Sequence, residues 1–211
     1  MRTHRPQPYV YSAVAIALAA LCAVAAFTNG TSGQPIFGSS YSSIAAANCW
    51  SADGNKDADD HSSRICRGKA ARVVFVSVDD LRETISVGNN RAEAAREPAA
   101  QAWFAPFSSA ALRIEWRMAG SEPIAIIQRW QLADQADQDK AGRPRDKALL
   151  IVTRLSPGGV CHVAYVDVAA NPDANELARK AADDSARFVC GKDQVKVVGK
   201  SGRAVEIAMQ R

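Results

Sequence analysis

Oxygen-bearing side chains recur at alternate positions in the segment SADGNKDADDHSSR, residues 51–64. They are Asp53, Asn55, Asp57 and Asp59. Calcium is a hard cation that takes carboxylate and amide oxygens from a flexible loop, so this spacing indicates a calcium site. The loop departs from the EF-hand pattern, because Ala58 stands where glycine makes the sharp turn and Arg64 where a bidentate glutamate is needed. We therefore expect either a looser calcium site or a solvated loop, and no other cofactor.

A pair of acids, Asp79 and Asp80, directly follows the apolar run 72–78, which predicts a buried strand. Many enzymes use carboxylates as general acids and bases. Glu83, however, lies three residues after Asp80, the spacing of a helix capping box, and Gly88 is suited to ending such a helix. No G-x-S-x-G elbow, phosphate-binding loop or HExxH motif is present. We therefore predict helix caps and no catalytic residues here, with a carboxylate-based periplasmic hydrolase as the alternative.

Cys161 and His162 have the side chains of a nucleophile–base pair, but neighbouring residues of a strand point to opposite faces of a sheet. We therefore interpret the cysteines as structural. Four remain once Cys22 in the N-terminal segment is set aside: Cys49, Cys66, Cys161 and Cys190. In an exported chain this even number indicates two disulfides, for which three pairings are possible. Proximity in the sequence favours Cys49–Cys66 and Cys161–Cys190.

The four tryptophans divide into two pairs. Trp116 and Trp130 belong to adjacent expected strands, and a turn near Ser121 would place them on the same face, which is core packing. Trp50 and Trp103 are less constrained by their surroundings. Either of them would suit a surface on which a sugar ring stacks, although aromatic residues make up 7% of the chain.

The elements that position these residues follow from hydrophobic periodicity. Strands are expected at 72–78, 112–118, 124–132, 149–155 and 160–169, and a C-terminal hairpin at 194–198 and 204–209. Helices are expected after Asp80, at 90–104 with an interruption at Pro98, and from Pro172 to about Val189. The predicted fold is α+β. It has an N-terminal strand–helix unit, an antiparallel meander of four or more strands covered by the long helix of the C-terminal half, and a C-terminal hairpin.

The N-terminus has the features of a secretory signal. Arg2, His4 and Arg5 precede an apolar run at 13–27, and no acidic residue occurs before Asp53. Cleavage after the small-residue pattern at 23–25 would release the mature chain. Alternatively, the uncharged residues 10–27 are long enough for an uncleaved signal anchor, which would be the point of membrane contact.

Both interpretations place the rest of the chain in the periplasm or outside the cell, either free or tethered to the inner membrane by a transmembrane helix. A lipoprotein signal using Cys22 is disfavoured by Leu21 before it. We predict a signal peptide or anchor at 1–27, a flexible linker rich in Ser, Gly and Ala at 28–48, and one disulfide-containing domain at 49–211.

The charge balance argues against a nucleic-acid partner. The chain has 26 Lys and Arg against 22 Asp and Glu, a net charge of +4. Removing residues 1–25 takes away Arg2 and Arg5 and no acid, which leaves 24 basic and 22 acidic side chains, or +2. Such a balanced domain provides no strong positive field for phosphates.

Several runs together resemble an uncharacterised family of small exported proteins of Gram-negative bacteria. They are CWSADGNKDADDHSSRICRGKA, AWFAPF, AIIQRW, VTRL, CHVAYVDVAANP and NELARKAADD, and they cover most of the chain after Cys49. The resemblance implies export and no activity, so no site is carried over from it. From the whole sequence we predict an exported or membrane-tethered cell-envelope domain that acts as a binding or accessory protein. The alternatives are the carboxylate-based periplasmic hydrolase and a calcium-stabilised envelope protein.

Overall fold

Strands dominate the part of the chain that the structure describes. The computed structural model describes residues 36–51 and 61–210, which belong to one compact unit of residues 35–211. The predicted signal or anchor at 1–27 lies outside the described residues. So do the four predicted calcium ligands, Asp53, Asn55, Asp57 and Asp59.

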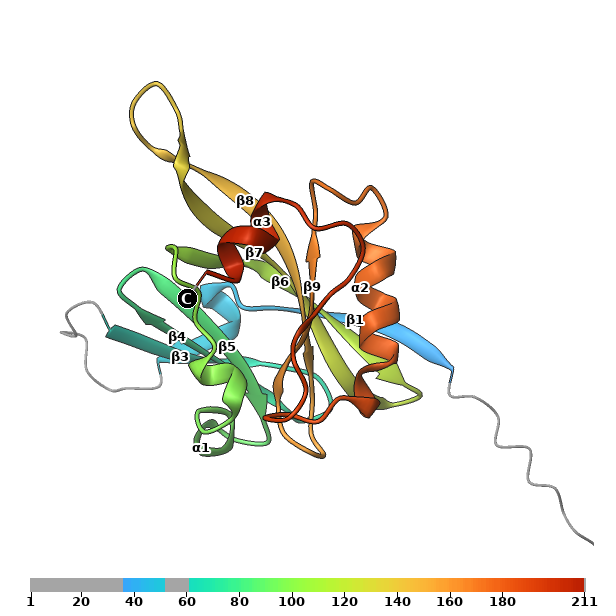
Figure 1. Ribbon diagram of the computed structural model, residues 1–211. Helices are drawn as coiled ribbons and strands as arrows, with labels where there is room; N and C mark the ends of the chain where they lie inside the picture. The colour runs from blue at the N-terminus through green and yellow to red at the C-terminus, as the bar shows by residue number, and fades with distance from the viewer. Residues whose placement is uncertain (1–35, 52–60, 211) are drawn as a thin grey trace, which may run out of the picture. The chain divides into compact units, whose positions relative to one another are not determined.

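The described residues form ten strands in one mixed sheet and three short α-helices (Figure 1). The strands are β1 (Phe37–Ser43), β2 (Cys49–Ser51), β3 (His61–Arg67), β4 (Val73–Asp79), β5 (Arg82–Gly88), β6 (Ser108–Ala119), β7 (Glu122–Gln138), β8 (Pro144–Arg154), β9 (Cys161–Asp167) and β10 (Lys196–Val197). The helices are α1 (Arg91–Ala94), α2 (Ala174–Asp183) and α3 (Arg203–Ala208). The strand order is β10-β9-β8-β7-β6-β5-β4-β3-β2, and β1 pairs with β6 off this path.

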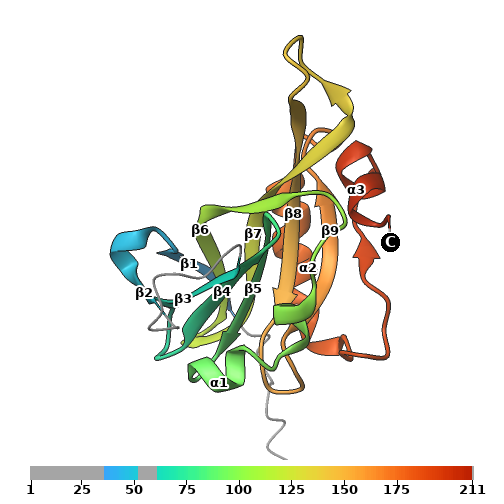
Figure 2. The same ribbon diagram turned by 90° about the vertical axis from the view of Figure 1, so that its left-hand side faces the viewer.

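The sheet folds into two layers where β5 meets β6. A single pair of described residues, Arg82 and Ser108, joins these two strands, so β2–β5 can fold over β6–β9 (Figure 2). Apolar side chains from both layers fill the space between them, among them Val74, Val76, Ile85 and Val87 of one layer and Ile114, Trp116, Ile126 and Trp130 of the other. Alternation along each strand delivers them to the inner face, and their burial is the main stabilising contribution.

Two disulfides are present, pairing Cys49 with Cys66 and Cys161 with Cys190 as proximity in the sequence predicted. Disulfides of this kind persist in oxidising compartments, so the protein is periplasmic or extracellular. None of the helices in the described residues is long and apolar enough to cross a lipid bilayer.

The predicted fold class is wrong, because no long helix covers the sheet. α2 is only ten residues long and packs on the outer face of β7–β9 through Ala174, Ala178 and Ala182. A 3₁₀ turn follows at 185–187, and the chain is extended at Phe188. The Arg154 guanidinium donates to the Phe188 carbonyl, and the disulfide at Cys190 holds the next residues to β9. These tertiary contacts end the helix earlier than the apolar stripe in the sequence predicted.

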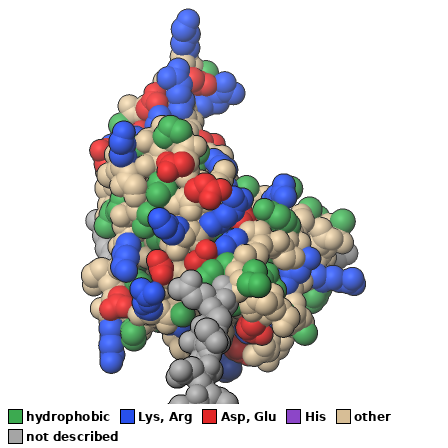
Figure 3. All heavy atoms as spheres, turned by 90° about the vertical axis from the view of Figure 1, so that its right-hand side faces the viewer, with side chains coloured by type: hydrophobic (Ala, Val, Ile, Leu, Met, Phe, Trp, Pro, Cys, Tyr) green, Lys and Arg blue, Asp and Glu red, His purple; other side chains and the backbone are tan. Residues whose placement is uncertain are grey.

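Ion pairs fix α2 to β6. The Arg117 guanidinium donates to both carboxylate oxygens of Asp183 at 2.9 and 2.8 Å, and Arg179 Nε donates to Glu115 Oε1 at 2.7 Å. On the face that Figure 3 shows, basic and acidic side chains are interspersed, without a large area of one sign.

The helix predicted after Asp80 is also wrong, because residues 82–88 form β5. Asp80 and Leu81 are left-handed (φ 46° and 60°) and make the two-residue turn of a hairpin between β4 and β5. Glu83 caps no helix: its carboxylate accepts from Ala110 N at 2.7 Å and from Arg64 Nη2 at 3.2 Å. The helix predicted at 90–104 is divided by Pro98 into α1 and a 3₁₀ turn at 98–101.

Two further segments differ from prediction. Residues 37–43, expected as linker, form β1 because they extend along β6 and exchange backbone hydrogen bonds with it. The C-terminal hairpin is absent from the described residues: β10 pairs in parallel with β9, and residues 203–208 form α3. A carboxylate oxygen of Asp167 accepts from Ala204 N at 2.9 Å, which stabilises a helix start. The strands expected at 112–118 and 124–132 are present within the longer β6 and β7, and those expected at 149–155 and 160–169 correspond to β8, which ends at Arg154, and to the shorter β9.

Candidate functional site

A cleft of about 580 Å³ opens on the outer face of the β4–β5 hairpin, and we call it the Trp103 cleft. Its floor follows from strand alternation, which turns Phe75, Ser77 and Asp79 of β4 outward together with Arg82 and Thr84 of β5. Ser77 and Thr84 are direct cross-strand partners, as are Asp79 and Arg82. The floor therefore passes from an aromatic ring through a row of hydroxyls to charged groups, and the volume suits a small ligand.

The wall of the cleft comes from residues 98–107, which cross from α1 to β6 and which we call the strap. Its adjacent aromatic residues point in opposite directions: Phe104 is buried, whereas Trp103 is 63% exposed and lines the cleft with Gln101. Phe104 fills the core beside Trp130, with ring centroids 5.7 Å apart in an edge-to-face arrangement. Burial of the Phe104 ring in the core therefore fixes the position of the neighbouring residue, Trp103, on the surface.

Backbone and side-chain hydrogen bonds hold the strap at several points. Ala99 N donates to the Val160 carbonyl at 3.0 Å, and Ala133 N donates to the Phe107 carbonyl at 3.0 Å. Arg82 donates to the Ala105 carbonyl from Nε at 3.0 Å and from Nη2 at 2.9 Å. Because both layers of the sheet contribute these bonds, the wall of the cleft has a defined position.

Arg82 organises the charged end of the cleft. Its guanidinium forms an ion pair with Asp80 and lies 5.1 Å from the ring centroid of Phe107 and 5.9 Å from that of Trp103. A guanidinium near aromatic faces gains cation–π stabilisation. With Asp79 beside this pair, the lining carries two acids and one base, so it favours ligands that have no negative charge.

The Thr84 hydroxyl is the most unusual group of the cleft. The residue is 7% exposed, and its Oγ1 has no hydrogen-bond partner among the described residues. A buried polar group without a partner costs about 1–3 kcal/mol, so proteins rarely retain one without a reason. Thr84 Oγ1 is one of six such buried side-chain atoms among the described residues, and the only one of the six that belongs to a residue lining the cleft. The atom itself is closed to solvent, so a rotation of the Thr84 side chain would let a ligand hydroxyl in the cleft supply the missing hydrogen bond.

The sequence-predicted site residues have different positions from those expected. Asp79 and Asp80 do not cap a helix; they are exposed at the rim of the Trp103 cleft. Trp50 lies on β2 and lines a separate, shallower hollow with Arg64. Cys161 is bonded to Cys190, while His162 belongs to another cavity and packs against Phe104, so cysteine and histidine form no catalytic pair.

Sequence reasoning missed the floor and wall residues Ser77, Arg82, Thr84 and Gln101. A signal for the floor was present, because polar residues alternate with apolar ones in VSVD at 76–79 and in TISV at 84–87. The capping-box interpretation obscured it by assigning the second run to a helix. Trp116 and Trp130 are core residues as predicted, and Trp116 opposes Ile126.

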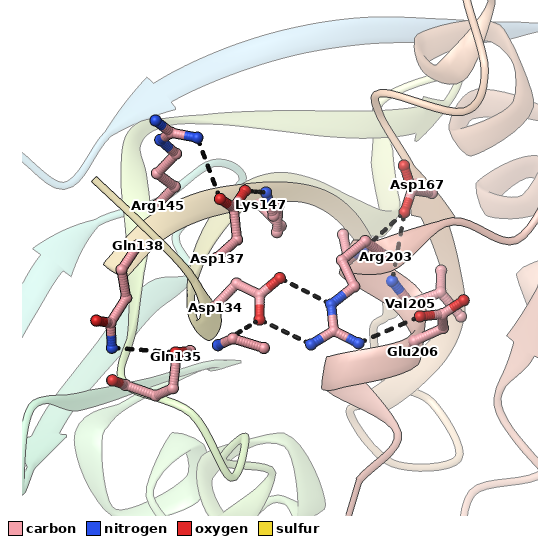
Figure 4. Close-up of polar contacts among 12 residues, drawn as sticks. Asp134, Gln135, Asp137, Gln138, Arg145, Lys147, Asp167, Arg203, Val205 and Glu206 are labelled. Atoms are coloured by element: carbon pink, nitrogen blue, oxygen red, sulfur yellow. Dashed lines mark hydrogen bonds and ion pairs between the residues drawn. The ribbon is translucent and has the colours of Figure 1, made fainter. Parts of the chain in front are cut away.

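Another polar cluster lies at the base of the projecting β7–β8 hairpin and has a structural role (Figure 4). The buried carboxylate of Asp134 accepts from Arg203 Nε and Nη2, both at 2.7 Å, and from Ala136 N at 3.2 Å. The hydrogen bonds from Arg203 hold the pKa of Asp134 below its usual value. The cluster ties α3 to the hairpin and leaves the Asp134 carboxylate fully bonded.

Comparison with protein-family models, with curated proteins and with solved structures finds no match to the chain. The described residues also contain no group of three or more His, Cys, Asp or Glu side chains that could hold a metal ion.

Proposed function

We propose that the protein is an exported, non-catalytic binding protein of the cell envelope, and that the Trp103 cleft holds its ligand. The observation that carries this proposal is a cleft with an exposed tryptophan in its wall and two hydroxyl-bearing residues in its floor, Ser77 and Thr84, of which Thr84 has no hydrogen-bond partner among the described residues. The ligand class that matches is an uncharged saccharide. Its C–H face would stack on Trp103, and its hydroxyls would bond to Thr84, Ser77 and the acids at the rim.

Binding is favoured over hydrolysis by the position of the acids. Glycosidases keep one carboxyl group protonated in an apolar pocket while a second stays ionised. Asp79 and Asp80 are instead exposed on a hairpin turn, and Asp80 pairs with Arg82. Their place in a cleft nevertheless makes the carboxylate-based hydrolase the second candidate. Release of nitrophenol from nitrophenyl glycosides that is lost in Asp79→Asn would support it.

Titration with methyl glucoside, maltose and diacetylchitobiose, followed by tryptophan fluorescence and calorimetry, tests the binding function. We expect Trp103→Ala to weaken binding at least about tenfold, the equivalent of roughly 1.4 kcal/mol of stacking. Trp50→Ala is the matched control, since it also removes a half-exposed tryptophan, 49% exposed on β2, and should leave affinity unchanged. No binding by any of the three probes, or equal effects of both variants, would overturn the proposal.

Two parts of the sequence prediction concern residues outside the described part of the chain. We propose that residues 1–27 direct export and that a calcium ion bound to Asp53, Asn55, Asp57 and Asp59 stabilises the segment between β2 and β3. Mass spectrometry of membrane and soluble fractions tests the first proposal by locating the mature N-terminus. Thermal unfolding with calcium and with a chelator tests the second, and an unchanged midpoint would contradict it.

A further inference from the structure

A second cavity, of about 540 Å³, lies on the other side of the strap, and we call it the His162 cavity. Its walls are mainly apolar and come from distant parts of the chain: Phe104 of the strap, Phe188 after α2, Val195 before β10, and Met209 after α3. Met209 is 55% exposed, so the apolar lining of the cavity extends to its opening. An apolar cavity of this size is suited to hydrocarbon.

The polar groups deep in the His162 cavity bond to each other and carry no charge at neutral pH. His162 Nδ1 lies 3.1 Å from the Tyr165 hydroxyl, and Phe104 packs against both rings. Burial lowers the pKa of His162 to about 4, because a charged imidazole would lose its hydration there. Asp193, at the exposed side of the cavity, accepts from Val189 N at 2.8 Å. The depth of the cavity is therefore neutral and apolar, unlike the floor of the Trp103 cleft.

The two cavities share part of one wall. Trp103 and Gln101 line both of them, one cavity lying against β4 and β5 and the other against β9 and the C-terminal segment. The bonds from Arg82 and Val160 to the strap fix this wall from both sides. A ligand that passes over the exposed Trp103 side chain would reach both cavities at once.

We infer that the two cavities form one elongated site for an amphiphile with a hydroxyl-rich, uncharged head and a single aliphatic chain. The head occupies the Trp103 cleft, where Thr84 lacks a partner, and the chain occupies the His162 cavity between Phe188 and Met209. This inference rests on the proposed function, because it assigns the head to the same cleft. It adds a second binding region and a ligand class, the glycolipid-like amphiphiles.

A matched set of three probes separates the contributions of head and chain. Octyl glucoside, used below its micelle concentration, carries both parts; methyl glucoside carries the head alone and octanol the chain alone. We expect octyl glucoside to bind at least about tenfold more tightly than either partial probe, measured by calorimetry and tryptophan fluorescence. Transfer of part of the chain from water into an apolar cavity is sufficient for such a gain.

Two variants, at residues of similar exposure, test where the aliphatic chain of the ligand lies. Met209→Asp places a charge at the opening of the His162 cavity and should remove most of the advantage of octyl glucoside over methyl glucoside. Leu112→Asp, on β6 outside both cavities, makes a similar change at a residue that is 57% exposed and should leave the advantage intact. Circular dichroism of both variants checks that they remain folded, and Met209→Gln provides a second, uncharged variant with the same expected direction.

The outcomes separate this inference from the proposed function. If methyl glucoside binds as tightly as octyl glucoside and depends on Trp103, the cleft is a saccharide site and the inference fails alone. If octanol binds as tightly as octyl glucoside, the head is not seated and the inference fails. Equal losses in Met209→Asp and Leu112→Asp would indicate adsorption of detergent on the surface, which also overturns it. If none of the probes binds, both proposals fall.

Discussion

The Trp103 cleft and the base of the β7–β8 hairpin treat buried polar groups in opposite ways. At the hairpin, the buried Asp134 carboxylate accepts three hydrogen bonds, two of them from Arg203 (Figure 4). In the cleft, the comparably buried Thr84 hydroxyl has no partner within the described residues. Both groups lost their hydrogen bonds to bulk water during folding, but only Asp134 gained hydrogen bonds within the protein in return.

The two regions therefore contribute to different properties of the protein: the base of the β7–β8 hairpin to stability, and the Trp103 cleft to ligand binding. A buried group such as Asp134, whose two carboxylate oxygens both accept hydrogen bonds from within the protein, contributes to the folded state and does not need a ligand to complete its bonding. A buried hydroxyl without a partner lowers stability, and its retention beside an exposed tryptophan is explained if a ligand completes its hydrogen bonding. Substitutions in the two regions should therefore affect different measurements.

The largest expected effect is a loss of stability at low pH, which a third buried polar group, His162, should cause. Burial lowers the pKa of His162 to about 4 from 6.5, so the unfolded chain binds the proton more readily than the folded protein. Stability should be complete above pH 6.5 and fall by about 3 kcal/mol as the pH drops toward 4. Urea unfolding between pH 7 and 4 measures this loss. His162→Gln should flatten the profile in that range, and equal slopes for both proteins would contradict the assignment.

Asp134→Ala should lower the free energy of unfolding by roughly 2 kcal/mol, because it removes a buried carboxylate and leaves Arg203 without its main partner. The estimate is at the low end for a buried pair, since Arg203 is 40% exposed and can be rehydrated. Urea unfolding at pH 7 measures the loss. Asp137→Ala is the control: Asp137 pairs with Arg145 and Lys147 but is 37% exposed, so little change is expected. Equal losses of unfolding free energy in both variants would contradict the expected difference between the buried pair at Asp134 and the surface pairs at Asp137.

The smallest effect on stability, and the sharpest test of the comparison, is expected for Thr84→Val. Valine keeps the shape of threonine and removes the unpartnered hydroxyl, so the free energy of unfolding should rise by about 1 kcal/mol, the low end of the cost of a buried group without a partner. Affinity for a saccharide probe should fall about threefold to tenfold. Ser42→Ala provides the contrast, because the Ser42 hydroxyl accepts from Trp116 Nε1 at 2.8 Å and its loss should destabilise the protein. A large destabilisation by Thr84→Val would show that the hydroxyl is bonded in the folded state.

Local patterns predicted the parts of the fold that depend on neighbouring residues. The alternation in LRIEWRM and its partner strand predicted β6 and β7 and the burial of Trp116 and Trp130 in the core. Sequence proximity predicted both disulfide pairings. The patterns failed where a short segment has two compatible conformations. Residues 82–88 satisfy both a capping box and a strand, and pairing with β4 decided between them.

The candidate site was only partly accessible to sequence reasoning. Asp79, Asp80 and Trp103 were singled out, the two acids as helix caps and Trp103 as one of two tryptophans suited to sugar stacking. What unites them is the strap, whose position depends on Phe104 in the core and on Arg82 bonded to Ala105. Those contacts join residues more than twenty positions apart in the chain, which local periodicity does not report.

The sequence by itself determined the oxidising compartment, through four cysteines that form two disulfides, and the faces of the strands, because alternation assigns each side chain to one side of a sheet. Only the tertiary structure decided that residues 37–43 extend β6, that residues 203–208 are helical, and that the strap separates two cavities. The physical reason is that free sheet edges, the Asp167 carboxylate and the buried Phe104 select among local conformations of similar energy. The same tertiary contacts place Thr84, whose hydroxyl has no partner among the described residues, in the floor of the Trp103 cleft.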